Sequence, residues 1–392
     1  MRILQVTPYF LPAWAYGGPP RVMWEYASGL ARLGHEVTVF TTDVLDADER
    51  AGPARERLEG VEVRRFANVS NTLAWRAKKY LPRGLLPALL RDARSFDAIH
   101  VTDARTFLTA AAYGTARLRD VPLCLSAHGS LPGSAGLRGK LKRLYDRALV
   151  GPMLERAALL LAQTDHEARL YLEAGARPET VRLLPLPLEL PGVPAEQGLL
   201  RRRAQLSDGA RALLFLGRIH RLKGLDLLVE AVEPLLVDDE SLVLVVVGRD
   251  DGHWDEVSNR FSHLLDRGSV RFIGPLYGEE RFAAYAEADV FCLTPRHWEE
   301  TSLAALEAAA CGTPVVVSEQ AEIPGLTESG GGFVVPLERD SIRAAVETAL
   351  ARSQEMGARA REHVERRHAK EAVVARLEAY LLEATAAERS AP

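Results

Sequence analysis

The stretch Arg2-Ile-Leu-Gln-Val-Thr7 has the length and apolar content of a short buried strand. A loop rich in Pro and Gly follows over residues 8–20, and the pattern beyond it predicts a helix over about 21–33 that ends at Gly34. The segment Glu36-Val-Thr-Val-Phe-Thr-Thr42 is the next predicted strand. A strand, loop, helix and strand in this order are typical of a parallel sheet with helices on both faces.

The same succession runs through the chain and restarts after a Pro-rich segment, Leu184–Pro194, which predicts an interdomain connection. At 392 residues the chain is long enough for two or three domains. We predict an α/β protein with two Rossmann-like parallel-sheet domains that face each other across a cleft, over residues 1–190 and 191–371. A C-terminal helix, about 372–392, is expected to pack back on the first domain.

The composition excludes several classes of protein. Hydrophobic residues make up 47% and charged residues 26% of the chain, as in a soluble globular protein. With 49 basic and 53 acidic residues the formal charge is −4, so nothing favours nucleic acid as a partner. No apolar run is long enough for a membrane span, a signal peptide is not evident, and the three cysteines lack disulfide or zinc spacing. We therefore expect a cytoplasmic protein.

Open parallel sheets bind ligands beyond the carboxyl ends of their strands, so the loops there are the candidate sites. In the first loop, Gly17 and Gly18 would let the backbone approach a ligand closely. The helix that follows would present free N–H groups and a positive dipole to an anion. An ordinary strand-to-helix turn is the alternative. The three-glycine dinucleotide fingerprint is absent, which counts against a nicotinamide enzyme.

A second loop, Gly217-Arg-Ile-His-Arg-Leu-Lys-Gly224, lies between a predicted strand and a predicted helix. Arg218 and Lys223 would converge on one diphosphate, with charge-assisted hydrogen bonds worth about 1.5–3 kcal/mol each. A solvated basic turn is the alternative. Only six of the 49 basic residues are lysines, so a lysine at position 223 is less expected of a merely solvated site.

The most specific segment is His297-Trp-Glu-Glu-Thr-Ser-Leu-Ala-Ala-Leu-Glu-Ala-Ala-Ala-Cys-Gly-Thr-Pro314. Ser302 is the predicted N-cap of an Ala- and Leu-rich helix that ends at Gly312. Glu307 lies among apolar residues of this helix, where a buried carboxylate is costly unless it is paired or binds a ligand. Glu299 stands in the loop before the helix, at the edge of the expected cleft. A place on the exposed face of the helix is the alternative for Glu307.

These residues resemble the retaining glycosyltransferases of family 4, the group 1 class with the GT-B fold. The family signature is two glutamates eight positions apart, followed by a small-residue helix and Gly-x-Pro; Glu299 and Glu307 match it, and Glu300 does not. The resemblance covers almost the whole chain. The other matching segments are Gly17-Gly18, Ser126–Gly129, Thr164–Glu167, Gly217–Gly224, Val247-Gly248, Phe272–Gly274 and Gly330–Pro336.

The resemblance implies a role for each motif. Arg218 and Lys223 would hold the donor diphosphate and stabilise its charge as the sugar departs. Glu307 would bind the ribose hydroxyls, Glu299 would contact hydroxyls of the transferred sugar, and His128 would lie beside that sugar. By itself, a lone histidine such as His128 is more often a core residue. Main chain would approach the phosphates and the base, and the remaining implied donor-binding residues are Gly17, Gly18, Gly248, Ile273, Gly274, Leu276, Ser302 and Leu303.

The chain departs from the family pattern at two places. Pro185-Leu-Pro-Leu-Glu189 stands where the family commonly has Asn-Gly-Val-Asp, and Asp103 stands where many relatives have a second histidine after His100. Contacts to donor or acceptor are expected to differ there. No Asp-x-Asp metal motif lies at a strand end, and Asp250-Asp251 is typical of a solvated turn. We therefore expect neither a metal nor a cofactor, the nucleoside-diphosphate sugar being a substrate.

The implied reaction moves a sugar from a nucleoside diphosphate to an acceptor hydroxyl with retention of anomeric configuration. A donor phosphate oxygen would take the acceptor proton on the same face, so the family mechanism needs no protein base. A nucleotide-sugar epimerase of the same fold and a non-catalytic partner subunit of a glycosyltransferase are the alternatives. An epimerase would need acid and base groups in the cleft, and no further carboxylate–histidine arrangement suggests them. A binding-only subunit would have no chemical need for Arg218, Lys223, Glu299 and Glu307 together.

Two basic amphipathic segments concern the acceptor. Trp75–Arg91 and Leu137–Tyr145 each combine basic residues with Leu and an aromatic residue. Such a face suits the interface of an anionic membrane, which would bring the protein to a lipid-linked acceptor, as in cell-surface polysaccharide or glycolipid synthesis. Solvated helix faces over an apolar core stripe are the alternative. The predicted partners are thus a nucleotide-sugar donor, a saccharide or lipid-linked acceptor and the inner face of a membrane.

Overall fold

The computed structural model describes residues 1–131, 142–192 and 196–390. The chain divides into two compact units, which we call unit 1 (Met1–Pro187 and Lys370–Pro392) and unit 2 (Leu188–Ala369). The expected divisions were after residues 190 and 371. The unit boundaries come slightly earlier because Leu188 forms a parallel bridge with Ala369 and donates a 2.7 Å hydrogen bond to the carbonyl of His368, which joins both ends of unit 2.

Unit 1 contains a sheet of eight strands in the order β3-β4-β2-β1-β5-β6-β7-β8. All neighbouring strands are parallel except the edge pair β3 and β4. The strands are β1 Arg2–Val6, β2 Glu36–Thr42, β3 Arg55–Leu58, β4 Val61–Phe66, β5 Ala98–Thr102, β6 Leu123–Ser126, β7 Leu159–Ala162 and β8 Val181–Leu183. The predicted parallel strands are confirmed. Strand β3 was missed because its four residues, three of them charged, carry no apolar pattern.

The helices of unit 1 are α1 Pro19–Arg32, α2 Asn71–Ala77, α3 Leu85–Asp92, α4 Phe107–Arg119, α6 Gly151–Arg156, α7 Asp165–Glu173 and α17 Lys370–Ser390, with short turns of helix at Trp14–Tyr16, Ala93–Ser95, Asp146–Val150 and Pro178–Thr180. The sequence pattern predicts one helix over about 72–92, and the structure shows that this prediction is wrong. Lys78 adopts a left-handed backbone (φ +53°), and the chain then runs through Pro82 before α3 begins, so the segment forms two helices.

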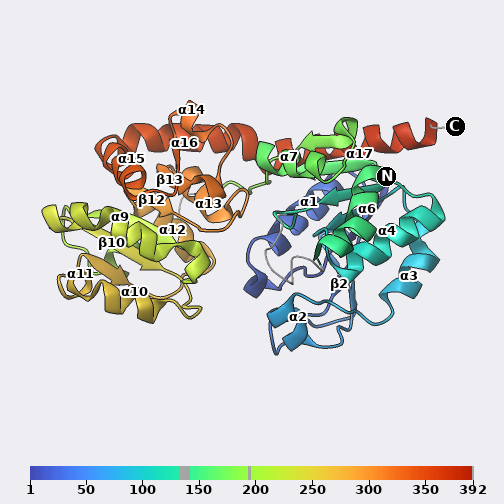
Figure 1. The fold of residues 1–392 in the computed structure, drawn as a ribbon, viewed down its shortest axis with the longest axis horizontal. Coiled ribbons are helices and arrows are strands. Elements are labelled where there is room, and N and C mark those ends of the chain that lie inside the picture. The colour runs from blue at the N-terminus through green and yellow to red at the C-terminus, as the bar shows by residue number, and fades with distance from the viewer. Residues whose placement is uncertain (132–141, 193–195, 391–392) are drawn as a thin grey trace. The chain divides into compact units, whose positions relative to one another are not determined.

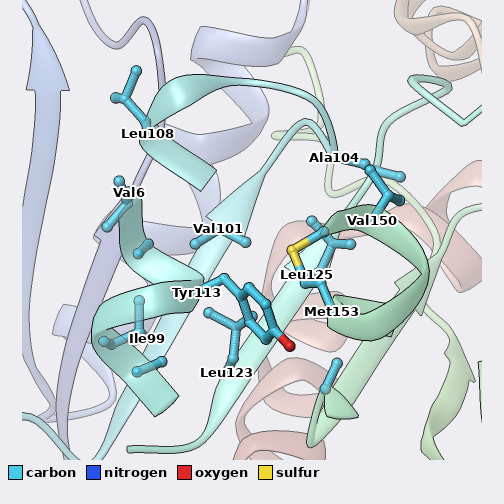
Figure 2. Close-up of a cluster of buried hydrophobic side chains, with 14 of the residues drawn as sticks. Val6, Ile99, Val101, Ala104, Leu108, Tyr113, Leu123, Leu125, Val150 and Met153 are labelled. Atoms are coloured by element: carbon cyan, nitrogen blue, oxygen red, sulfur yellow. The ribbon is translucent and has the colours of Figure 1, made fainter. Parts of the chain in front are cut away.

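The core of unit 1 lies between its sheet and the helices that cover it. Figure 2 shows side chains of β5 and β6 beside those of α4 and α6, among them Ile99, Val101, Leu123, Leu125, Leu108, Tyr113 and Met153. Helix α17, red in Figure 1, packs against α1 in this unit. Gly29 makes that contact close, because a Cβ on Gly29 would lie 2.5 Å from Cγ2 of Val374. A buried ion pair between Lys370 and Glu25 joins the same two helices.

Unit 2 contains a sheet of six parallel strands in the order β11-β10-β9-β12-β13-β14. The strands are β9 Arg211–Leu216, β10 Leu242–Val247, β11 Val270–Phe272, β12 Val290–Leu293, β13 Val315–Ser318 and β14 Gly332–Val335. The helices are α8 Leu199–Arg203, α9 Leu225–Asp238, α10 Trp254–Arg260, α11 Ser262–Asp266, α12 Glu279–Glu287, α13 Leu303–Ala310, α14 Leu326–Ser329, α15 Arg339–Ala351 and α16 Ser353–His368. Each strand is short and almost entirely apolar, as expected for a sheet buried on both faces.

The strand orders place the candidate loops. In unit 2, β9 is flanked by β10 and β12, so the loops after these three strands meet at one edge of the sheet. In unit 1, the loops after β1, β5, β6 and β7 meet in the same way. These two edges are described separately below.

Candidate active site

The loop after β9 is held tightly to its neighbours in unit 2. Ile219 pairs with Asp250, and Nδ1 of His220 accepts a 3.1 Å hydrogen bond from the backbone N–H of Leu222. Gly224 then starts α9 with φ +67°, and a Cβ there would lie 1.9 Å from the carbonyl oxygen of Thr294. Only glycine fits that position, so the loop is pressed against the end of β12.

Lys223 of this loop contacts Glu299, one of the two signature glutamates. The distance from Nζ to Oε2 is 2.7 Å, and about a fifth of each side chain is exposed (21% and 20%). The two residues are 76 positions apart in sequence. The structure therefore joins two sequence-predicted site residues in a partly buried pair that solvent still reaches.

Arg218, of the same loop, is paired with a different carboxylate. Its side chain is 59% exposed, and Nη1 donates to Oδ2 of Asp251 at 2.8 Å. Asp250, which we expected in a solvated turn, accepts hydrogen bonds from the N–H groups that start α10. Burial alone would raise the pKa of Asp250, but these backbone donors hold it below its usual value. The Asp250-Asp251 turn thus has a structural role in addition to contacting Arg218.

A hydrogen-bond network that the sequence did not predict supports the loop that carries Lys223. Arg296 donates to both carboxylate oxygens of Asp226, at 2.7 and 2.5 Å, and to the carbonyl of Arg221 at 2.8 Å. Nε2 of His253 lies 3.2 Å from the same carboxylate. Burial opposes ionisation of Asp226, but the hydrogen bonds from Arg296 and His253 lower its pKa to about 2. The Arg296 side chain, held by its ion pair with Asp226, therefore also fixes the backbone at Arg221, just before Leu222 and Lys223.

Glu307 is buried in α13, as predicted, with 5% of its surface exposed. It is paired with Arg281 of α12, whose Nε and Nη2 donate to the two carboxylate oxygens at 3.0 and 3.1 Å. The Arg281 guanidinium also stacks 4.2 Å above the ring of Phe282. Ser302 accepts from the N–H of Ala305, which confirms it as the N-cap of α13. No local pattern identifies Arg281, because it lies on another helix 26 positions away.

Three glycines, Gly217, Gly248 and Gly274, bring the backbones after β9, β10 and β11 close together. A Cβ on Gly248 (φ +150°) would lie 1.8 Å from the carbonyl oxygen of Gly217. The N–H of Gly248 donates to the carbonyl of Gly274 at 3.0 Å. Gly274 has φ +77°, and Leu276 beyond it is buried. The three predicted backbone segments therefore meet where β9, β10 and β11 end.

At the edge of unit 1, His128 follows β6 with a left-handed backbone (φ +47°). Its Nδ1 atom lies 2.5 Å from Nε2 of Gln163, and burial lowers the pKa of its imidazole to about 4. His100 is wholly buried and bonds to Ser126 at 2.8 Å, which agrees with a core residue. Asp103 accepts a 3.0 Å hydrogen bond from Tyr9, and burial raises the pKa of its carboxyl to about 6.

The glycine loop of unit 1 differs in one respect from the expectation. Gly17 has φ +82° with open space around it, as a close approach to a ligand requires. Helix α1, however, begins with Pro19 and Pro20, which have no N–H, and the N–H of Arg21 already bonds to the carbonyl of Gly18 at 3.0 Å. The expectation of free N–H groups here is therefore wrong for these positions, although the helix dipole remains.

Comparison with known proteins assigns the chain to a family. Residues 210–352 match the family described as glycosyl transferases group 1, and residues 17–187 match the glycosyl transferase 4-like domain. The D-inositol 3-phosphate glycosyltransferase of Kineococcus radiotolerans is 34% identical over 383 residues, which cover 88% of this chain and 85% of the relative. The chain belongs to the group 1 glycosyltransferases.

Other group 1 relatives and solved structures agree. The D-inositol 3-phosphate glycosyltransferase of Geodermatophilus obscurus is 31% identical over 368 residues, which cover 88% of this chain and 80% of the relative. The crystal structure of Anabaena Alr3699/HepE in complex with UDP matches with a TM-score of 0.75 at 17% identity, over 98% of this chain and 100% of HepE. The fold is GT-B. Membership in this family favours a transferase over the epimerase and the non-catalytic subunit.

Two kinds of feature are absent from the part of this glycosyltransferase that the structure describes. Among residues 1–131, 142–192 and 196–390, no group of three or more His, Cys, Asp or Glu side chains is arranged to hold a metal ion. In that same part of the chain, no helix combines the length and apolar character needed to cross a lipid bilayer.

Proposed function

We propose that this group 1 glycosyltransferase transfers a sugar from a nucleoside diphosphate sugar to an acceptor hydroxyl with retention of anomeric configuration. The observation that carries the proposal is the contact of Lys223 with Glu299 at the carboxyl edge of the unit 2 sheet. A cation beside a carboxylate offers one group to an anionic phosphate and the other to sugar hydroxyls. Both groups are still partly exposed, so a ligand can reach them.

Cleavage of the anomeric bond places negative charge on the departing diphosphate. Lys223 would stabilise that charge, and Arg218 would join it after exchanging its contact with Asp251 for one with the phosphate. The clamp of Arg296 on Asp226 limits how far the Lys223 loop has to reorganise. A donor phosphate oxygen would take the acceptor proton. Charge stabilisation by these two cations is also why we propose that transfer needs no metal, so activity should survive EDTA.

Recognition of the nucleotide would rest on Glu307 and on the backbone at Gly248 and Gly274. Arg281 donates to both oxygens of Glu307, which fixes the orientation of the carboxylate, and the remaining lone pairs would accept from paired hydroxyls such as those of ribose. The open space beside Gly274, where a Cβ would meet no atom within 4 Å, would accept a flat base. Because the HepE structure was also solved with UDP-glucose, UDP-glucose is the first donor to test.

The acceptor is proposed to be a hydroxyl of a saccharide or of a lipid-linked sugar in cell-surface polysaccharide or glycolipid synthesis. The relatives named above act, by their names, on D-inositol 3-phosphate, and that compound is the second acceptor to test. We further propose that the reaction takes place in the cytoplasm, where nucleotide sugars are available.

Membrane contact stays a prediction. In the structure, the aromatic residues of the first basic segment pack within unit 1, so its exposed leucines would have to make the contact. The ring of Trp75 lies 5.2 Å from that of Tyr16, and Tyr80 is buried in the core of unit 1. Leu81 and Leu86 of the first segment remain exposed, as does Leu73 just before it. Most of the second segment, residues 137–141, lies outside the described residues. Flotation with anionic liposomes at low salt tests this proposal, and no binding would remove the membrane as a partner.

Two variants test the site assignment. Lys223→Ala and Glu307→Ala are each expected to lower kcat/KM for transfer from the working donor by about 10–100-fold, the equivalent of one charge-assisted hydrogen bond. Arg376→Ala and Glu347→Ala, which remove a cation and an anion at exposed positions outside the proposed site, are the controls and should keep full activity. Circular dichroism would establish that all four variants are folded. Normal turnover by both site variants would remove the assignment.

A further inference from the structure

His253, the N-cap residue of α10 in unit 2, is a buried histidine whose backbone belongs to the turn after β10. It is 2% exposed, and its N–H donates to Oδ1 of Asp250 at 3.1 Å. The next residue of that turn, Asp251, accepts from Arg218 at 2.8 Å. The backbone of His253 is therefore tied to the turn that holds one of the two predicted diphosphate cations.

The ring of His253 contacts the first turn of α9. Nε2 lies 3.2 Å from Oδ1 of Asp226, and Nδ1 lies 3.2 Å from Oε2 of Glu256. Burial opposes ionisation of Asp226, but the hydrogen bonds from Arg296 and His253 lower its pKa to about 2. Near pH 7 this carboxylate can only accept hydrogen bonds, so Nε2 must carry a proton and donate it.

Asp226 passes this contact on to the loop after β9. Its Oδ1 atom accepts a second hydrogen bond, from Nη1 of Arg296 at 2.7 Å. The same Nη1 donates to the carbonyl of Arg221 at 2.8 Å, and the backbone N–H of Arg296 donates to the carbonyl of Leu222 at 2.8 Å. Arg296 thus holds two consecutive carbonyls of the loop. The place of its guanidinium depends on Asp226, which His253 helps to fix.

The loop 217–224 is in this way held at both ends by one short segment, residues 249–253. At the start of the loop, Ile219 forms a parallel bridge with Asp250, and its N–H and carbonyl bond to that segment at 2.9 and 3.0 Å. At the end of the loop, the support comes through the ring of His253. Both predicted diphosphate cations stand on this loop, so their spacing depends on the segment.

We propose that His253 is a positioning residue for the diphosphate of the bound nucleotide sugar. Through Nε2–H it fixes Asp226 and Arg296, and these hold the loop 217–224 in the conformation that binds the diphosphate. The proposal deepens the proposed function and rests on it for the identity of the ligand. His253 acts through the loop rather than by contact with the ligand. Without it the loop is ordered for a smaller fraction of the time, and the apparent affinity falls by that fraction.

The first test needs no ligand. In ¹⁵N NMR of the full-length protein at pH 7.5, Nε2 of His253 should carry a proton, and His253→Gln assigns the signal by removing it. His253→Met removes the donor, while His253→Gln has the same length and keeps an amide N–H for Asp226. Backbone hydrogen exchange of residues 219–224 should be faster in His253→Met, and His253→Gln should restore most of the protection. A wild-type ring without a proton on Nε2, or unchanged exchange in His253→Met, would overturn the proposal.

Nucleotide binding tests the consequence for the diphosphate. With UDP as the probe, His253→Met should raise the Kd about tenfold, the scale of one hydrogen bond to a charged group, and His253→Gln should stay within about threefold of the wild type. His263→Met, the same substitution at a half-exposed histidine of unit 2, should leave the Kd unchanged. An unchanged Kd in His253→Met would overturn the role in diphosphate binding and leave the proposed function standing. If the wild-type protein binds none of UDP, GDP and ADP, the proposed function fails, and hydrogen exchange of residues 219–224 still decides the positioning.

Discussion

Acidification from pH 7.5 to 5.0 is expected to lower the free energy of unfolding of unit 1 by about 2.5 kcal/mol, and three buried groups determine the size of this loss. Burial lowers the pKa of His128 to about 4, and burial together with the nearby His128 lowers the pKa of His100 to about 3. Burial acts in the opposite sense on Asp103, whose carboxyl has its pKa raised to about 6.

The magnitude follows from linkage between protonation and folding. An unfolded chain binds a proton at each histidine below about pH 6.5, and the folded chain does not until pH 4 or 3. The stability that each neutral ring contributes is therefore complete above pH 6.5 and is lost as the pH falls, by about 2 kcal/mol per histidine at pH 5. Asp103 binds its proton more readily in the folded chain, which returns about 1.4 kcal/mol at pH 5. The two histidines together lose about 4 kcal/mol of stability and Asp103 returns about 1.4 kcal/mol, so unit 1 loses about 2.5 kcal/mol in all.

Urea unfolding followed by hydrogen-exchange mass spectrometry measures the two units separately. In His128→Asn the loss between pH 7.5 and 5.0 should shrink by about 2 kcal/mol, since asparagine does not titrate and tolerates a left-handed backbone. In Asp103→Asn the loss should grow by about 1.4 kcal/mol. His263→Gln, at a half-exposed position in unit 2, is the control and should leave unit 1 unchanged. An undiminished loss in His128→Asn would refute the reasoning.

Two further predictions concern unit 2, both measured by urea unfolding. Gly224→Ala should lower the free energy of unfolding by at least about 2 kcal/mol more than Gly209→Ala does. Both glycines have left-handed backbones, but of the two only the Cβ at 224 would meet another atom, the carbonyl oxygen of Thr294. Equal losses would contradict the close approach. Arg281→Met should cost about 2–3 kcal/mol, because it removes the cation from the buried Glu307 carboxylate, and adding Glu307→Gln should recover part of that loss. A double variant no more stable than the single one would show that the pair is not the cause.

Local pattern was sufficient for most of the architecture. Short apolar strands alternating with helices determine a parallel sheet, because only burial on both faces suits strands such as Leu242–Val247. The N-cap at Ser302 and the burial of Glu307 also followed from neighbours in sequence. Where the pattern was weak, it failed. The charged edge strand β3 was missed, and Lys78 interrupts a helix that periodicity alone extended from 72 to 92.

The sequence by itself determined the α/β class, the family and the residue types at the strand ends, since these depend on local periodicity, turn residues and short motifs. The tertiary structure alone decided which of those residues meet. Four contacts join segments from different strands or helices: Lys223 with Glu299, Arg281 with Glu307, Arg296 with Asp226, and the Glu167 carboxylate with the N–H groups of Gly129 and Gln163. Contacts between segments far apart in the chain are set by strand order and helix packing, and no local pattern records them.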